Sequence, residues 1–275
     1  MSAHADPNPA LTVGVDAAGL RFLLTATGVD LARTLTIGRQ QLFLEQDALE
    51  AAFRDHGRPL AAHDARELLA GDRWAEPLFE RLGAGSVSSL DASDYEGATI
   101  VADLNRPVDT LDAQFSCVFD GGTLEHVFEF PTALRSCMRM VAQGGHLITI
   151  SPFDHYAGHG FYQLGPEVPF RAFTRENGYE LERVLVSEGA ERWWELSDPL
   201  EVGRRPVLPR RRPMLIYAQA RRVDLTEPLR IPPQESDYAA LWAGRSVSPA
   251  PRPSLVDRML GRAPRDPAFM RRVRL

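Results

Sequence analysis

The chain alternates short apolar runs with longer amphipathic stretches. The runs have the length and the polar or glycine boundaries of buried strands, and they lie at 31–38, 86–91, 98–104, 115–120 and 146–150. Apolar residues at helical spacing through 40–82 and 130–141 predict helices between them, and Pro131 suits a first helical turn. Strands that alternate with helices predict an α/β sheet with parallel strands and helices on both faces.

The last third of the chain changes character. A helix is expected around 166–177, followed by strands at 179–186 and 214–220, which we expect to pair antiparallel because no clear helix separates them. From residue 223 the pattern fades into a segment rich in Pro, Arg and Ser. Its two weak apolar patches, at 238–242 and 255–260, are expected to dock on a protein partner or a membrane surface, or to serve self-association. We therefore divide the chain into an N-terminal extension (1–30), one domain (31–222) with a helical insertion at about 40–82, and a partly disordered C-terminal extension (223–275).

Composition narrows the chemistry. Residues 1–200 carry 15 Arg and 30 Asp plus Glu, whereas residues 201–275 carry 16 Arg and 7 acids. All 31 basic residues are arginine, which excludes Schiff-base chemistry, pyridoxal phosphate anchoring and the lysine-dependent phosphate loop. No apolar run reaches the roughly 20 residues of a transmembrane helix, and the start of the chain lacks the pattern of a secretory signal. Two cysteines fit a reducing compartment, so a cytoplasmic protein is expected.

Three consecutive predicted strands end at or next to an aspartate: Asp91, Asp103 and Asp120. Ligands of open α/β sheets bind outside the carboxyl ends of the strands. Each aspartate can cap the following turn, but the three together favour a nucleoside site, in which a carboxylate accepts ribose hydroxyls. The loop after the first strand has one glycine, Gly38, so the usual glycine-rich loops for NAD, FAD and ATP are excluded.

Two segments carry a family resemblance. Residues 115–127 (FSCVFDGGTLEHV) and 134–147 (LRSCMRMVAQGGHL) resemble the strand, helix start and glycine turn of class I S-adenosylmethionine-dependent methyltransferases. Residues 158–167 (GHGFYQLGPE) resemble a segment of a bacterial subgroup of methyltransferase-like proteins. The resemblance implies a doubly wound, mostly parallel, seven-stranded Rossmann-like sheet whose last strand is antiparallel, and S-adenosylmethionine as the cofactor.

The resemblance also implies positions for the cofactor. Gly38 matches the first glycine of the cofactor loop, Thr36 stands where an acid is usual, and Gln40 stands where a later glycine is usual, with Arg39 available to the methionine carboxylate. The remaining cofactor positions are the ribose carboxylate Asp91, the adenine-edge pair Asp103 and Leu104, and the wall beside the methionine part formed by Asp120, Gly121, Gly122 and Thr123.

Methyl transfer asks little of the protein, because the sulfonium is already activated and only positioning and proton removal remain. The candidate bases are His126, His155 and His159, with Tyr162 as an orienting hydroxyl. The acceptor implied is a small molecule or a glycan precursor. For His126, packing at the start of a helix is the alternative role.

Other chemistries fit less well. Asp154, His155 and His159 have a spacing that suits metal ligands on a helix, but Gly158 and Gly160 disfavour a helix there, so no metal site is predicted. The G-x-S-x-G motif of serine hydrolases is missing. Arginine clusters at 204–205 and 210–212 lack a nucleic-acid-binding motif, so binding of nucleic acid is not expected. A second functional reading stays open: the degenerate loop is also typical of a non-catalytic relative that serves as a binding or assembly subunit.

Overall fold

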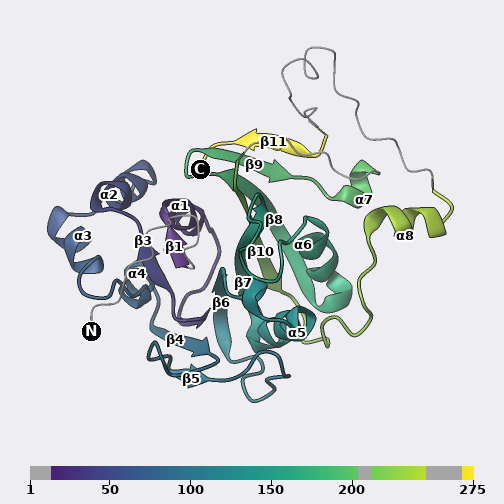
Figure 1. The fold of residues 1–275 in the computed structure, drawn as a ribbon, viewed down its shortest axis with the longest axis horizontal. Coiled ribbons are helices and arrows are strands. Elements are labelled where there is room, and N and C mark those ends of the chain that lie inside the picture. Colours follow the sequence, from purple (N-terminus) through teal and green to yellow (C-terminus); the bar gives the residue numbers. More distant parts are fainter. Residues whose placement is uncertain (1–13, 204–211, 246–267) are drawn as a thin grey trace, which may run out of the picture.

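A nine-stranded mixed sheet forms the centre of the protein in the computed structural model, which describes residues 14–203, 212–245 and 268–275 (Figure 1). The strands follow the order β11-β9-β8-β10-β7-β6-β2-β4-β5. Their bounds are β2 Arg33–Ile37, β4 Ser86–Asp91, β5 Ile100–Val101, β6 Phe115–Gly121, β7 Val141–Asp154, β8 Tyr179–Glu188, β9 Arg192–Leu196, β10 Met214–Arg222 and β11 Met270–Val273.

The sheet confirms the predicted parallel core and corrects the number of strands. Strands β5, β4, β2, β6 and β7 are parallel, and β10 lies antiparallel between β7 and β8. The prediction of seven strands is wrong because β9 and β11 continue the sheet beyond β8 in antiparallel pairs. The sequence of β9, Arg-Trp-Trp-Glu-Leu, buries Trp193 against Tyr217, which joins this added strand to one of the two core clusters.

Helices cover both faces of the sheet, as predicted (Figure 1). Helices α1, α2, α3 and α4 pack with one core cluster, and α5 and α6 with the other. Alternation along β6 separates the two clusters, because Val118 belongs to one and Cys117 and Phe119 to the other. The helices are α1 Ala17–Leu24, α2 Gln46–Asp55, α3 Ala62–Leu68, α4 Glu76–Leu82, α5 Phe130–Met140, α6 Glu167–Ala172, α7 Pro199–Val202 and α8 Ser236–Trp242, with 3₁₀ turns η1 Leu124–His126 and η2 Arg175–Asn177.

The two ends of the predicted helical insertion lie next to one another. The Ala75 amide donates to the Gln40 carbonyl at 2.9 Å, and the Leu42 amide donates to the Arg73 carbonyl at 2.8 Å. Residues 41–74 therefore form an excursion that contains β3 (Gln41–Phe43), α2 and α3. Helix α4 starts directly where the chain returns, so it takes the place of the helix that follows a strand in a doubly wound sheet.

The segment before β2 is tied to this excursion. Strand β1 (Gly14–Asp16) pairs in parallel with β3, and a side chain at Gly14 would bring a Cβ atom within 2.4 Å of the Gln41 carbonyl oxygen. Helix α1 follows and buries Leu20 and Phe22 completely. These residues were predicted to belong to an extension, but they lie in the core cluster that α2, α3 and α4 also pack with. The predicted domain boundaries stay a prediction.

Part of the predicted C-terminal extension is ordered against the domain. Strand β11 pairs with β9. The predicted apolar patch 238–242 forms part of helix α8, in which Leu241 and Trp242 are more than half exposed. The patch at 255–260 and the arginines at 204–205 and 210–211 lie outside the described residues. Across the described ranges, no helix has the length and apolar character needed to cross a membrane.

Both cysteines lie in the core, and this yields a first testable prediction. Burial raises the pKa of the Cys117 thiol to about 12 and raises that of Cys137 well above its usual range. Because the thiolate is the reactive form, the native protein is expected to release no chromophore from a disulfide reagent, and both thiols are expected to react after denaturation. Rapid reaction of either thiol in the native protein would contradict this burial.

Candidate functional site

Three predicted site residues meet at the carboxyl ends of neighbouring strands. Ile37 of β2 pairs with Leu90 of β4 on one side and with Asp120 of β6 on the other. The next residues, Gly38, Asp91 and Gly121, therefore lie side by side at one edge of the sheet. The chain runs from β2 to β4 and β5 in one direction and then to β6 and β7 in the other, so this edge is the topological switch point where doubly wound sheets bind ligands.

Gly38 holds a tight turn directly after β2. Its φ of +70° is a left-handed conformation, and a Cβ atom there would lie 2.6 Å from Thr123 Oγ1. The Thr123 hydroxyl donates to the Ile37 carbonyl at 2.7 Å, which joins the end of β6 to the end of β2. The turn thus needs a glycine for both conformation and space, as the first glycine of a cofactor loop does.

The side chain of Gln40 fills the space beside this turn. It is 2% exposed, and its Nε2 donates to the Ile37 carbonyl at 2.6 Å. A Cβ atom at Gly121 would lie 2.3 Å from Gln40 Oε1, so the two strand ends close around the amide. Gln40 Oε1 itself is buried and receives no hydrogen bond within the described part of the chain. Gln40 thus stands where the resemblance implied a glycine, and it occupies the space that the glycine would leave.

Arg39 bridges the outer side of the same loop. Its Nε donates to Glu76 Oε1 at 2.7 Å, and its Nη1 donates to the Glu96 carbonyl at 2.8 Å. The guanidinium also stacks on the Trp74 ring at 4.3 Å. Thr36, in contrast, is buried within β2, where its hydroxyl lies 3.5 Å from the Ser88 carbonyl. The carboxylate that the family has at this position therefore has no substitute in Thr36.

The aspartates after β4 and β5 have different surroundings. Asp91 is half-buried at the end of β4, and its carboxylate accepts from the Ala92 amide at 2.6 Å. Burial and the Asp91 carboxylate raise the pKa of Glu96, which places the two acids near one another. Asp103 is exposed and caps a turn, since hydrogen bonds from the Asn105 amide and side chain lower its pKa. Leu104 is buried against the core.

Asp120 lies beneath the loop after β6. It is fully buried, and its Oδ1 accepts from the amides of Thr123 and Leu124 at 2.9 and 3.2 Å. Burial and the nearby carboxylate of Glu125 raise its pKa well above the usual range, against the lowering effect of these amides. Because Asp120 and Val118 lie on the same side of β6, the carboxylate faces the α5 layer. Asp120 therefore supports the loop, in which Gly121 and Gly122 are buried and Thr123 is half-buried at the strand end.

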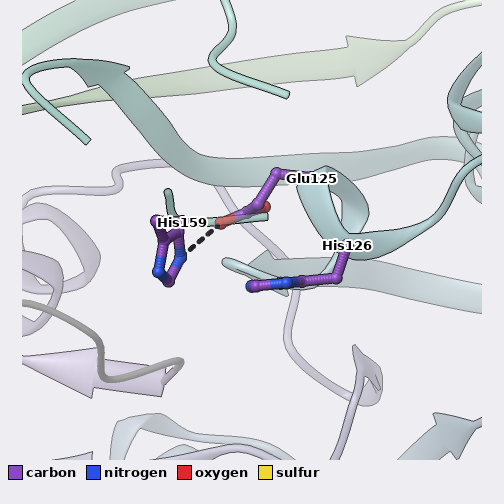
Figure 2. A group of neighbouring side chains, drawn as sticks. All are labelled: Glu125, His126 and His159. Carbon is purple, nitrogen blue, oxygen red and sulfur yellow. Dashed lines mark ion pairs between the residues drawn. The ribbon is translucent and has the colours of Figure 1, made fainter. Parts of the chain in front are cut away.

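Two of the predicted bases meet at one acid. Glu125 and His126 belong to η1, and His159 comes from the loop after β7 (Figure 2). His159 Nε2 lies 3.7 Å from Glu125 Oε1, and the His126 and His159 rings meet edge to face with centroids 4.8 Å apart. Glu125 is 1% exposed, whereas His126 is exposed. Partial burial lowers the pKa of His126, with His159 adding to this effect and Glu125 opposing it.

The other two candidates lie apart from this group. His155 adopts a φ of +63° and pairs with Asp154, with Nδ1 3.3 Å from Oδ2. The Tyr162 hydroxyl donates to the Phe128 carbonyl at 2.6 Å, so its proton is already engaged. His155, His159 and Tyr162 share one loop without a helix, and this loop packs on η1 through the hydrogen bond from the Phe161 amide to the Glu125 carbonyl at 2.8 Å.

Three further residues near the site, Glu125, Tyr156 and Asp16, were not among those predicted from the sequence. Burial raises the pKa of Tyr156 to about 12, and the carboxylates of Asp16 and Glu125 add to this effect, so these acids lie near the phenol. Asp16 caps α1 by accepting from the Gly19 amide at 2.7 Å. The sequence did carry a signal for Glu125, because it is adjacent to His126 and a further histidine, His159, follows downstream. Asp16 and Tyr156 meet only through the tertiary fold.

The sheet has the predicted parallel core, followed by antiparallel strands. Solved structures match the chain at low similarity. One is the S-adenosylmethionine-dependent methyltransferase of Mesorhizobium loti, with 16% identity over 75% of this chain and 98% of that chain and a TM-score of 0.39. Another is 1,6-didemethyltoxoflavin-N1-methyltransferase of Burkholderia thailandensis, with 10% identity over 76% of this chain and 78% of that chain and a TM-score of 0.37. No family profile and no curated protein sequence matches the chain.

Proposed function

We propose that the protein binds S-adenosylmethionine and transfers its methyl group to a small-molecule or glycan-precursor acceptor. The observation that supports this proposal best is the alignment of Gly38, Asp91 and Gly121 at the topological switch point of the sheet. A tight glycine turn beside a strand-end carboxylate is the combination that binds a nucleoside: the turn admits the ligand to the backbone, and the carboxylate accepts ribose hydroxyls.

The residues at this edge fit such a ligand once Gln40 has moved. Asp91 has only one short hydrogen bond, to its neighbour Ala92, so acceptor capacity remains for two hydroxyls. Gln40 Oε1 is an acceptor without a donor in a buried place, a situation that costs about 1–3 kcal/mol. A movement of Gln40 that exposes its amide would relieve this cost and leave room for the methionine part beside Thr123. Asp91 would then bind the ribose.

The bound cofactor would supply an activated methyl group, so the protein has to orient the acceptor and remove its proton. His126 is an exposed candidate base, and its lowered pKa favours a neutral ring that can accept a proton at neutral pH. His159 and His155 lie on the facing loop, where they would orient the acceptor together with Tyr162.

One observation favours the second candidate function, a non-catalytic binding or assembly subunit. The amide of Gln40 fills the space that a methionine part would need, and both neighbouring strand ends pack closely on it. A chain that has lost its cofactor would keep such a side chain as part of its core. The two candidate functions therefore differ in whether Gln40 is displaced by the cofactor.

Titration of the full-length protein with S-adenosylmethionine and S-adenosylhomocysteine tests the proposal. We expect one ligand per chain, with heat in a calorimeter and a rise in the unfolding temperature, because a ligand that binds only the native state stabilises it. The absence of both signals at saturating ligand would reject the proposed function and leave the binding subunit.

Replacing Gln40 by alanine is expected to tighten binding of S-adenosylhomocysteine about tenfold. The ligand no longer has to displace a buried amide and break its hydrogen bond to the Ile37 carbonyl, which amounts to about 1.4 kcal/mol. Affinities of the two proteins are compared by calorimetry. Gln41→Ala, which removes a neighbouring amide bonded to the Asp72 carbonyl, is the matched control and should leave affinity unchanged. Equal or weaker binding by Gln40→Ala would show that this side chain does not block the site.

A further inference from the structure

We propose that Glu125, His126 and His159 form a binding site for one divalent transition-metal ion of the zinc type. Each residue offers one ligand atom, and these three atoms lie within 4.8 Å of one another. Figure 2 shows the His159 ring turned toward the Glu125 carboxylate, with the His126 ring extending below the same carboxylate. The proposal does not depend on the binding of S-adenosylmethionine, and an ion held here would occupy the His126 and His159 rings, so it is an alternative to the base and orienting roles given to them above.

The buried carboxylate is the strongest argument. Glu125 is 1% exposed, and neither of its oxygens receives a hydrogen bond from any residue that the structure describes. The His159 Nε2 atom lies 3.7 Å from Glu125 Oε1, beyond hydrogen-bond range. A buried acid without donors is costly unless a positive charge balances it. The second buried acid, Asp120, increases the need for a positive charge here, since the two carboxyl groups lie close enough to affect one another.

The backbone holds the ligands from two segments in place. Glu125 and His126 are adjacent in η1, which Asp120 supports from below through the Thr123 and Leu124 amides. His159 is held by the loop after β7, because the amides of Phe161 and Tyr162 both donate to the Glu125 carbonyl, at 2.8 and 3.3 Å. The backbone segments that carry the three side chains are therefore held next to one another.

Gly160 allows this close approach. Its φ is +66°, and a Cβ atom there would lie 2.9 Å from the Glu125 carbonyl oxygen. The glycine that disfavoured a helix in the sequence thus brings the neighbouring His159 against η1. The metal reading of the sequence paired His159 with His155, whereas in the structure His159 meets Glu125 and His126.

The nitrogen and oxygen ligands of this group favour transition-metal ions over magnesium and calcium. Two imidazoles and one carboxylate suit zinc, iron, cobalt or nickel, whereas magnesium and calcium prefer oxygen ligands. Ligands bound to zinc at about 2.0–2.2 Å in a tetrahedron are about 3.4 Å apart, so Glu125 and His159 need to approach by only a few tenths of an ångström. Three protein ligands leave a fourth position open, as in catalytic rather than structural zinc sites. The exposure of His126 gives an ion access from solvent.

Zinc titration of the full chain, expressed without a histidine tag and stripped with a chelator, tests the site. Competition with a chromophoric chelator is expected to give one tightly bound Zn²⁺ per chain, and magnesium is expected not to compete. Cobalt in place of zinc should show visible absorption bands. Each of Glu125→Gln, His126→Gln and His159→Gln should weaken zinc binding about tenfold or more and weaken the cobalt bands.

The matched control is His63→Gln. His63 lies on α3 with Nε2 2.8 Å from Asp64 Oδ1, so it is a histidine–carboxylate pair without a third ligand, and its loss should leave zinc binding unchanged. Circular dichroism and thermal unfolding show whether each variant folds. If the buried Glu125→Gln fails to fold, His126→Gln, at an exposed position, decides the question. Absence of stoichiometric zinc binding, or wild-type zinc binding by His126→Gln and His159→Gln, would overturn the proposal.

Discussion

Replacement of Asp91 by alanine is expected to weaken binding of S-adenosylhomocysteine about a hundredfold. The carboxylate stands at the end of β4, next to Gly38 in the adjacent strand, where it would accept both ribose hydroxyls. Hydrogen bonds to a charged acceptor contribute about 1.5–3 kcal/mol, which corresponds to ten- to a hundredfold in affinity. Calorimetric titration of the wild-type and variant proteins measures the difference. Asp91→Asn should fall between them, since it keeps an acceptor and loses the charge.

A nearby acid provides the control for this prediction. Asp94 lies in the same loop and is exposed, so Asp94→Ala removes the same charge from the loop without removing the proposed ribose acceptor. Its effect should be less than about twofold, because exposed charges are screened by salt. Equal losses in Asp91→Ala and Asp94→Ala would show that only the charge of the loop matters. Unchanged binding in Asp91→Ala would remove this residue from the site.

Replacement of Arg222 by methionine is expected to lower the free energy of unfolding by about 3 kcal/mol. Arg222 is 4% exposed on β10, and its Nη1 donates to the carbonyls of Arg139 and Val141 at 2.6 and 2.7 Å. Its Nε donates to the Asp224 carbonyl at 3.2 Å. The guanidinium thus satisfies carbonyls at the end of α5, where a positive charge also favours the helix dipole. Methionine keeps the packing and leaves buried acceptors without donors.

The adjacent arginine separates this effect from a general loss of charge. Arg221 pairs with Glu180 at 2.7 Å but is 40% exposed, so Arg221→Met should cost less than about 1 kcal/mol. Urea unfolding of both variants, followed by circular dichroism, gives the two free energies and the slope that reports the surface exposed. Similar stabilities of the two variants would mean that the carbonyls at the end of α5 find other donors when Arg222 is absent.

The parts of the fold that were predictable follow from local pattern. The apolar run at 115–120 became β6 over Phe115–Gly121, and the pattern with Pro131 became α5 over Phe130–Met140, each within one residue of the expected bounds. Helix α1 was not predicted, although Asp16 is a good N-cap residue and Leu20, Phe22 and Leu23 are apolar. Eight residues give too little periodicity to stand out from a polar start of the chain.

The candidate site shows a sharper limit. Asp91 and Asp103 both end predicted strands, but one lies beside Gly38 and the other caps an exposed turn with Asn105, a difference set by pairing and local hydrogen bonds. The conformation of Gln40 depends on β6, since its amide packs against Gly121. The contact between Glu125 and His159 depends on how the loop after β7 folds back on η1. None of these relations is encoded in spacing along one segment.

The excursion formed by residues 41–74 also bears on how this chain is compared with others. It is inserted between Gln40 and Ala75, in the turn that joins β2 to α4. It therefore interrupts the sequence motif by which such a turn is recognised. Measured along the chain, Asp91 lies far from Gly38, yet the strands that end at these residues are neighbours. An alignment of this chain should therefore join residue 40 to residue 75 before it assigns an equivalent for Asp91. Relatives without the excursion should then align through α4 and β4 without a gap.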